Sequence, residues 1–159
     1  MTGVQTCALP ICEADIERLY YLAQSSAKRQ GRKVIYSREF FDRLLKISVG
    51  NNNILWLKAM LEDQMIASQV TFFDRGEALN WFYYYDKKYS YYKPGYLLAD
   101  YAIDHSIQNG IKYFSMGSTP GQIESVVKYK ERWGCEERSY NNYAYFNFLG
   151  KMICGWRRR

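Results

Sequence analysis

The spacing of hydrophobic residues predicts two helices at the start of the chain. Over residues 13–30 the apolar side chains recur every three or four positions, which places them on one face of a helix that ends at Gly31. Ser37 has the residue type of an N-cap for a second helix, whose apolar face is formed by Phe40, Phe41, Leu44 and Leu45. Each helix therefore has one face suited to packing against other elements.

The middle of the chain has the run lengths and turns of a β-meander. Apolar runs over residues 54–61, 65–73 and 77–85 are separated by short polar turns, which predicts three antiparallel strands. Alternation along the third strand predicts one face made of Trp81, Tyr83 and Tyr85 and an opposite face that is also aromatic. We therefore expect this strand to be central and covered on both sides.

The remainder of the chain mixes helices and strands. Pro94 is suited to the first position of a helix, and Thr119 has the position of an N-cap for a later one that begins at Pro120. The order predicts an α+β fold with a mixed, mostly antiparallel sheet of about six or seven strands flanked by about four helices. The expected elements of this part are a helix over residues 94–109, a strand over 112–116, a helix over 120–133, and strands over 135–139 and 143–148.

A lysine falls on the apolar side of the last predicted helix. Ile123, Val126 and Val127 share one stripe, and Lys130 lies within about 20° of Ile123 at 100° per residue. A lysine directed at a core is costly unless something there requires its charge. The alternative is a side chain whose stem packs on the core while its ammonium group reaches water.

Composition bounds the class of protein. A length of 159 residues with 48% hydrophobic residues fits one folded domain, and a net charge of +6 favours an anionic partner of unspecified chemistry. The four cysteines have no metal-ligand spacing and there is one histidine, so we predict no metal site. No apolar run approaches the roughly 20 residues of a membrane span. Free thiols are typical of a cytoplasmic protein, which is the expected location.

The first 11 residues differ from the rest of the chain. They carry no charge and no periodicity, and they resemble the translation of a common sequencing adapter read from a GTG start. We therefore expect residues 1–11 to be a non-native tail without regular structure. Residues 12–159 would then form a single domain.

Five short segments follow the predicted meander: PGYLL at residues 94–98, NG at 109–110, YFSMGS at 113–118, YK at 129–130 and WG at 133–134. From residue 54 onward, the order of elements is similar to that of the GNAT acyltransferase fold. A strand that ends in a glycine–serine loop, followed by a helix with an aromatic–lysine pair and an aromatic–glycine, resembles the Fem-type branch of that superfamily, which includes BioF2-like and FemAB-like proteins. The resemblance covers roughly residues 13–148.

The resemblance implies transfer of an acyl or aminoacyl group to an amine. Donors in this branch are acyl-CoA or aminoacyl-tRNA, and acceptors include small molecules and cell-wall precursors. Fem-type proteins often contain two such modules in tandem, so the chain is expected to be the C-terminal module of a longer protein that lacks its N-terminal partner here.

One segment departs from the pattern of the superfamily. Acyl-CoA-binding GNAT proteins have a glycine-rich loop before the central helix, whereas this chain has Tyr91-Tyr92-Lys93-Pro94-Gly95-Tyr96. A proline and bulky rings leave fewer backbone N–H groups to bind a pyrophosphate. This departure favours an aminoacyl-tRNA donor, or no donor, over acyl-CoA.

We predict two catalytic residues. Lys130 matches the lysine of the aromatic–lysine pair and would stabilise the oxyanion or hold a donor phosphate, and Tyr85 is suited to protonate the leaving group. Packing and capping are competing interpretations of the expected substrate-binding residues, which are Trp81, Tyr83, Tyr92, Lys93, Gly95, Ser118 and Thr119.

Three hypotheses follow. The first is a Fem-type acyl- or aminoacyltransferase, and the second is a noncatalytic GNAT-like module that binds nucleic acid or a protein. The basic, aromatic segment of Lys87, Lys88, Tyr89, Tyr91, Tyr92 and Lys93 suits base stacking and phosphate contacts, or is an ordinary solvated loop. The third hypothesis is a fragment that is inactive without its missing half.

Overall fold

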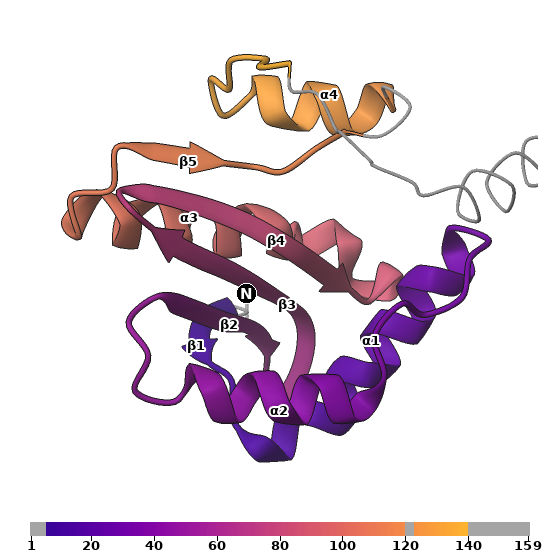
Figure 1. The fold of residues 1–159 in the computed structure, drawn as a ribbon. Helices are drawn as coiled ribbons and strands as arrows, with labels where there is room; N and C mark the ends of the chain where they lie inside the picture. The colour runs from indigo at the N-terminus through magenta and orange to yellow at the C-terminus, as the bar shows by residue number, and fades with distance from the viewer. Residues whose placement is uncertain (1–5, 120–122, 140–159) are drawn as a thin grey trace, which may run out of the picture. The chain divides into compact units, whose positions relative to one another are not determined.

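A computed structural model describes residues 6–119 and 123–139. The chain divides into two compact units, residues 1–120 and residues 121–159. The first unit contains a five-stranded sheet and its helices (Figure 1). Its strands are β1 (Thr6–Pro10), β2 (Ile54–Leu61), β3 (Gln64–Asp74), β4 (Glu77–Tyr85) and β5 (Tyr113–Ser115). Its helices are η1 (Glu13–Asp15), α1 (Ile16–Arg29), α2 (Arg38–Ser48), η2 (Lys87–Tyr92) and α3 (Pro94–Gln108).

The strands of the sheet follow one another in sequence order, β1-β2-β3-β4-β5. The pairs from β1 to β4 are antiparallel, and β4 pairs with β5 in parallel. The short turns after β2 and β3 require antiparallel pairing there, whereas α1 and α2 lie between β1 and β2. Helix α3 forms the crossover between these two parallel strands. The predicted α+β fold with a mixed, mostly antiparallel sheet is therefore confirmed.

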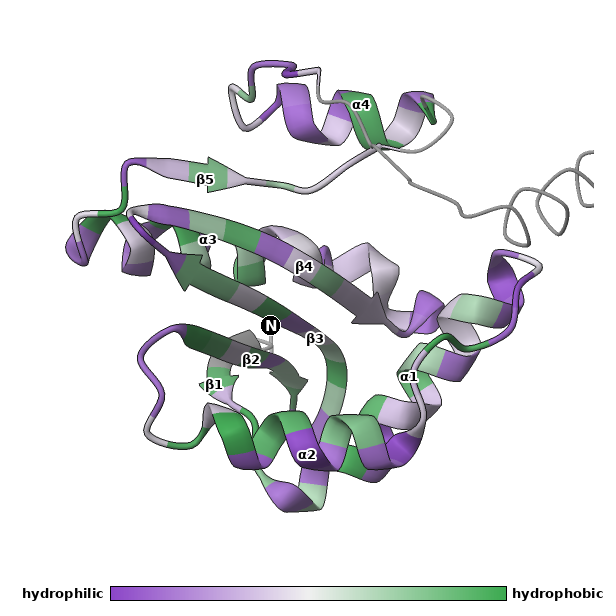
Figure 2. Ribbon diagram, in the orientation of Figure 1, coloured by the Kyte–Doolittle hydropathy of each residue, from purple (hydrophilic) through white to green (hydrophobic). Residues whose placement is uncertain are grey.

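Helices cover both faces of the sheet, and each face has its own hydrophobic core. Helices α1 and α2 pack on one face around Phe41, which is fully buried among the rings of Trp56 and Phe82. Helix α3 covers the other face, where Leu98 and Ala102 pack on the sheet. The ribbon of α2 alternates between hydrophobic and hydrophilic segments (Figure 2), as expected of a helix with one buried side.

Local signals in the sequence set the starts of two helices as predicted. The Ser37 hydroxyl accepts a hydrogen bond from the backbone N–H of Phe40 at 3.4 Å, which makes Ser37 the N-cap of α2. Pro94 is the first residue of α3 and is preceded by Lys93 in the left-handed conformation, with φ 50°. The segment expected to be a loop before α3 contains the 3-10 helix η2.

The expectation that residues 1–11 lack regular structure was wrong. Residues 6–10 form β1, which pairs antiparallel with β2 from Thr6 opposite Leu61 to Pro10 opposite Leu57. An uncharged segment can extend along this outer edge of β2 because it satisfies the ladder hydrogen bonds there.

The described residues form a sheet of five strands, whereas six or seven were predicted for the whole chain. Residues 135–139 form no strand, and the strand expected at residues 143–148 lies outside the described residues. In the second unit, α4 (Glu124–Glu131) begins after the N-cap Ile123, without a side-chain cap. The expected start at Thr119 and Pro120 was wrong, because a favourable capping residue does not by itself determine where a helix begins.

A β-bulge in β4 changes which residues share a face. Val70 pairs with Phe82 and Thr71 pairs with Asn80, so Trp81 is the extra residue. The ring of Trp81 therefore packs with Phe82 toward α2. The prediction that Trp81 shares a face with Tyr83 and Tyr85 was wrong, because alternation along a strand does not continue through a bulge.

The core under α2 yields a stability prediction. We expect Phe41→Ala to lower the free energy of unfolding by about 3–5 kcal/mol, because it removes a fully buried ring from an aromatic cluster. Ile47→Ala on the same helix is the control, since Ile47 is 60% exposed and its loss should cost under about 0.5 kcal/mol. Urea denaturation measures both, and equal losses would contradict the assigned core.

Candidate active site

The pairing of β4 with β5 stops before β4 ends. The parallel ladder joins Glu77 to Tyr113, Ala78 to Phe114, and Leu79 to Ser115. Strand β4 then continues to Tyr85 without a further β5 pair among the described residues. Residues 80–85 therefore form a stretch of β4 that is paired with β3 on one side and has left β5 on the other.

A glycine lies where the chain leaves β4. Gly117 has φ +72°, and a Cβ atom placed on it would lie 3.3 Å from the backbone oxygen of Asn80. A side chain would be strained by the positive φ and crowded by β4. This position therefore requires glycine for both reasons.

A column of stacked groups follows the end of β4. The Tyr83 and Tyr85 rings stack at 5.3 Å with an angle of 10° between their planes. The Arg29 guanidinium at the end of α1 lies 4.5 Å from the centre of the Tyr85 ring, and its Nη1 donates to the Tyr85 carbonyl at 3.3 Å. A Cβ on Gly95 would lie 3.0 Å from the Tyr83 ring, so Gly95 permits this ring to pack on the first turn of α3. The column thus connects α1, β4 and α3.

The N-terminal end of α3 carries the positive end of the helix dipole but offers few free backbone N–H groups. Pro94 has no N–H, and the N–H of Tyr96 donates to the Lys93 carbonyl at 2.9 Å. The N-terminal end of a helix dipole still favours an anion. The exposed side chain of Lys93 adds a positive charge at the same end.

Asp86 anchors the segment between β4 and α3. Its carboxylate accepts from the Arg18 guanidinium at 2.8 Å and from the backbone N–H of Lys88 at 3.1 Å. Arg18 also donates from Nε to the Met65 carbonyl at 3.0 Å. These bonds fix η2 to α1 and β3.

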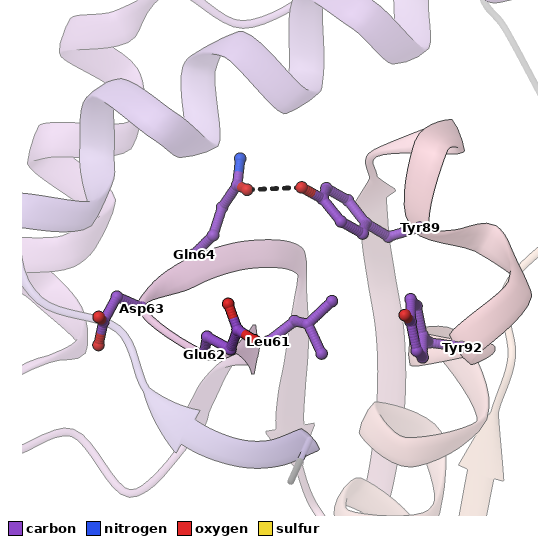
Figure 3. A pocket seen from close by; sticks show the side chains of 6 residues that line it. All are labelled: Leu61, Glu62, Asp63, Gln64, Tyr89 and Tyr92. Carbon is purple, nitrogen blue, oxygen red and sulfur yellow. Dashed lines mark hydrogen bonds between the residues drawn. The ribbon is translucent and has the colours of Figure 1, made fainter. Parts of the chain in front are cut away.

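A hollow of about 330 Å³ lies between η2 and the β2–β3 turn (Figure 3). The Tyr89 hydroxyl spans it and donates to Gln64 Oε1 at 2.7 Å. Among the residues that line the hollow, the carboxylates Glu62 and Asp63 come from the turn, and Tyr89 and Tyr92 come from η2. Tyr92, expected among the substrate-binding residues, therefore lines this hollow.

The structure groups some of the predicted site residues and separates others. Tyr83, Tyr85, Lys93 and Gly95 meet where β4 ends and α3 begins. Trp81 packs on the opposite face of the sheet. Two more predicted site residues of the first unit, Ser118 and Thr119, follow Gly117. Neither of them caps α4.

Lys130 belongs to the second unit and is half-buried on α4. Burial lowers the pKa of its ammonium group below the ordinary value, and the nearby Cys135 opposes that shift. The backbone N–H of Cys135 donates to the Lys130 carbonyl at 3.3 Å. Ile123, expected on the same buried stripe, is 55% exposed.

Two residues of this region, Arg29 and Asn80, were missed from the sequence. Arg29 lies in a basic cluster at the end of the first helix, where a favourable interaction with the helix dipole explains its charge, and its contact with Tyr85 spans 56 positions of sequence. Asn80 gave no signal, and the close approach of Gly117 to its backbone oxygen depends on the strand pairing. Arg29 carried the one usable signal, a basic cluster at the end of the first helix.

The described residues contain neither a metal-binding cluster nor a membrane-spanning helix. No group of three or more histidine, cysteine, aspartate or glutamate side chains is arranged to hold a metal ion in residues 6–119 or 123–139. No helix within those ranges has the length and apolar character needed to cross a membrane.

Comparisons with known proteins place the chain among acetyltransferases. A family model described as an acetyltransferase (GNAT) domain matches residues 6–131. No curated protein sequence matches the chain.

Solved structures share the fold at low identity. A possible acetyltransferase from Clostridium difficile 630 has a TM-score of 0.72 at 15% identity, over 90% of this chain and 98% of its own. The PaiA N-acetyltransferase from Thermoplasma acidophilum, solved in complex with coenzyme A, has a TM-score of 0.66 at 20% identity, over 80% and 88%. The ribosomal-protein-S18-alanine N-acetyltransferase from Escherichia coli has a TM-score of 0.65 at 17% identity, over 92% and 87%.

The role of Gly117 can be tested with a matched glycine. We expect Gly117→Ala to lower the free energy of unfolding by about 1–2 kcal/mol from the positive φ alone, plus a further cost from the contact with β4. Gly110→Ala is the control, because Gly110 has φ +69° and no atom within 4 Å of its added Cβ. Urea denaturation gives the free energy of unfolding of each variant. The difference between the two losses measures the cost of the contact between a Cβ at residue 117 and the Asn80 backbone oxygen. A Gly110→Ala loss as large as that of Gly117→Ala would contradict it.

Proposed function

Because the chain belongs to the acetyltransferase (GNAT) domain family and is an acyl-group transferase, we propose that it moves an acyl group from acyl-CoA to an amine. The observation that carries the proposal is the early end of the β4–β5 pairing beside the first turn of α3. Residues 80–85 lie beyond the last β5 pair and offer a strand edge along which an extended donor can lie.

The start of α3 is the proposed position of the donor phosphates. The helix dipole and Lys93 supply positive charge there, which offsets the N–H groups lost to Pro94 and to the Tyr96–Lys93 bond. Tyr83, held against Gly95, forms the adjoining wall. These residues fit an acyl-CoA without a glycine-rich loop because charge replaces part of the backbone contacts.

Acyl-CoA supplies an acyl thioester whose carbonyl carbon accepts an amine. We assign Lys130 to stabilise the negative oxygen that develops at this carbon, since a cation near the oxyanion lowers the barrier. The C–N bond forms as the C–S bond breaks, and the proton that the amine loses passes to the leaving sulfur. Tyr85, whose ring Arg29 holds, lies five residues along β4 from Asn80, a span of about 16 Å, so we assign it to the donor-binding wall beside Tyr83. Ser118 and Thr119, which follow Gly117, are assigned to substrate contacts.

The acceptor is proposed to be a primary amine of a small molecule or a cell-envelope precursor. The Fem-type motifs support this class, and the fold is shared with proteins whose names state N-acetyltransfer. We also propose that the chain is a cytoplasmic Fem-type module.

A second donor class is favoured by one observation. Tyr91 is 88% exposed beside the exposed Lys87 and Lys88, which is an arrangement suited to stacking on unpaired bases. If the donor is aminoacyl-tRNA, binding should weaken steeply with salt. Tyr91→Ala should then lower affinity for tRNA and leave acetyl-CoA turnover unchanged.

The donor can be tested directly with purified protein. We expect acetyl-CoA to be consumed in the presence of a panel of amines comprising a polyamine, an amino sugar, an aminoglycoside and a peptide with a free N-terminus. Release of free thiol measures the reaction. If no amine of the panel leads to thiol release and calorimetry detects no binding of CoA, an acyl-CoA donor is contradicted.

The role of Lys130 predicts a pH dependence. If its cation is required, kcat/KM falls as pH rises through the pKa of Lys130, which burial places below that of an ordinary lysine. Lys130→Arg should move this alkaline limb upward because arginine stays protonated, and Lys130→Ala should lower kcat/KM by about 10²–10³-fold. Lys128→Ala on the same helix, whose ammonium is exposed and pairs with Glu124, is the control. An alkaline limb that is the same in wild type and Lys130→Arg would remove Lys130 from the mechanism.

A further inference from the structure

Asn80 carries a buried oxygen with no partner. Its Oδ1 is shielded from solvent and accepts no hydrogen bond from any described residue. Buried polar atoms in folded proteins are nearly always hydrogen-bonded, because leaving one unpaired costs free energy. An exception is therefore a candidate for an atom that is paired only when a ligand is bound.

The position of Asn80 coincides with the end of the β4–β5 ladder. Leu79 makes the last pair with β5, and Asn80 is the next residue. It lies opposite the buried Thr71 and immediately before the bulge at Trp81. Its backbone oxygen is the atom that a side chain at residue 117 would approach.

The neighbouring buried amide on β3 is already engaged. Gln69 Nε2 donates to the Leu98 carbonyl at 3.4 Å and lies 3.5 Å from the Thr71 hydroxyl. Gln69 therefore satisfies the carbonyl of α3 with its own amide. Gln69 is thus engaged with α3, whereas the Oδ1 of Asn80 on the neighbouring strand has no partner among the described residues.

Resting on the proposed function, we propose that Asn80 Oδ1 accepts a hydrogen bond from an N–H group of a bound substrate. A donor whose phosphates lie at the start of α3 and whose arm follows residues 80–85 brings its thioester end toward Asn80. Two N–H sources reach this point, which are the amide in the arm of the CoA thioester and the amine that attacks it. Asn80 is thus a substrate-positioning residue at the point where the strands separate.

Asn80→Leu separates this role from a structural one. Leucine has the same branched shape and number of side-chain heavy atoms, and no polar atom, so relief of the unpaired oxygen should raise the melting temperature by about 2–4 °C in the protein without ligand. The same change should weaken substrate binding by about threefold to tenfold, the effect of one lost hydrogen bond. Asn80→Asp retains an acceptor oxygen and should restore binding to within about twofold of wild type.

Calorimetry with CoA alone and steady-state kinetics with an amine from the panel distinguish the two sources. A weaker affinity for CoA assigns the N–H to the thioester arm. An unchanged CoA affinity with a raised KM for the amine assigns it to the acceptor. The neighbouring Leu79→Ala, at a residue that is 41% exposed, is the control and should change neither value. If Asn80→Leu does not fold, Asn80→Ala takes its place.

Two results would count against the inference, and they differ from a failure of the proposed function. Unchanged CoA affinity together with unchanged amine KM in Asn80→Leu overturns the role of Asn80, whatever happens to the melting temperature. Wild-type protein that neither binds CoA nor acylates any amine overturns the proposed function first, before any substitution is made, and with it the substrate assigned to Asn80.

Discussion

The departure of the chain from β4 after Leu79 is the constraint on which the proposed site depends. A parallel ladder of only three residue pairs holds β5 to β4, and Gly117 then turns the chain while in close contact with the Asn80 backbone. Had the ladder continued, residues 80–85 would be paired on both sides and closed to an extended ligand. The length of β5 therefore determines whether a strand edge is available inside the sheet.

A second set of contacts holds that edge in place. The column from Arg29 through Tyr85 and Tyr83 to Gly95 joins the end of α1 to the start of α3 across the last residues of β4. Strand β4 is held against β3 by the antiparallel ladder, so the column mainly fixes the rings and the first turn of α3. A bulge at Trp81 adjusts the face of the strand on which these rings lie.

Much of the fold of the first unit could be predicted because its signals are local. The strands β2 and β4 have the predicted bounds, since each is an apolar run between polar turns, and Ser37 caps α2 by contacts within four residues. Strand β1 could not be predicted, because pairing with the outer edge of β2 leaves no periodicity in five residues. The start of α4 was misplaced because Thr119 satisfies the chemistry of a cap without being one.

The candidate site was predicted in part for the same reason. Tyr83 and Tyr85 were identified from the alternation of the third strand, and Lys93 and Gly95 from the segment before the central helix. All four lie at the end of β4 and the start of α3. Arg29 and Asn80 depend on contacts between distant segments and on the end of a ladder, which no local pattern encodes. Trp81 was assigned to the wrong face because a bulge shifts the alternation by one residue.

Backbone hydrogen–deuterium exchange in the presence and absence of acetyl-CoA tests the central claim most directly. The account predicts that the amides of residues 80–85 and of the first turn of α3 become protected when acetyl-CoA binds, while those of β2 do not change. Protection confined to the hollow between η2 and the β2–β3 turn, with β4 unchanged, would contradict it.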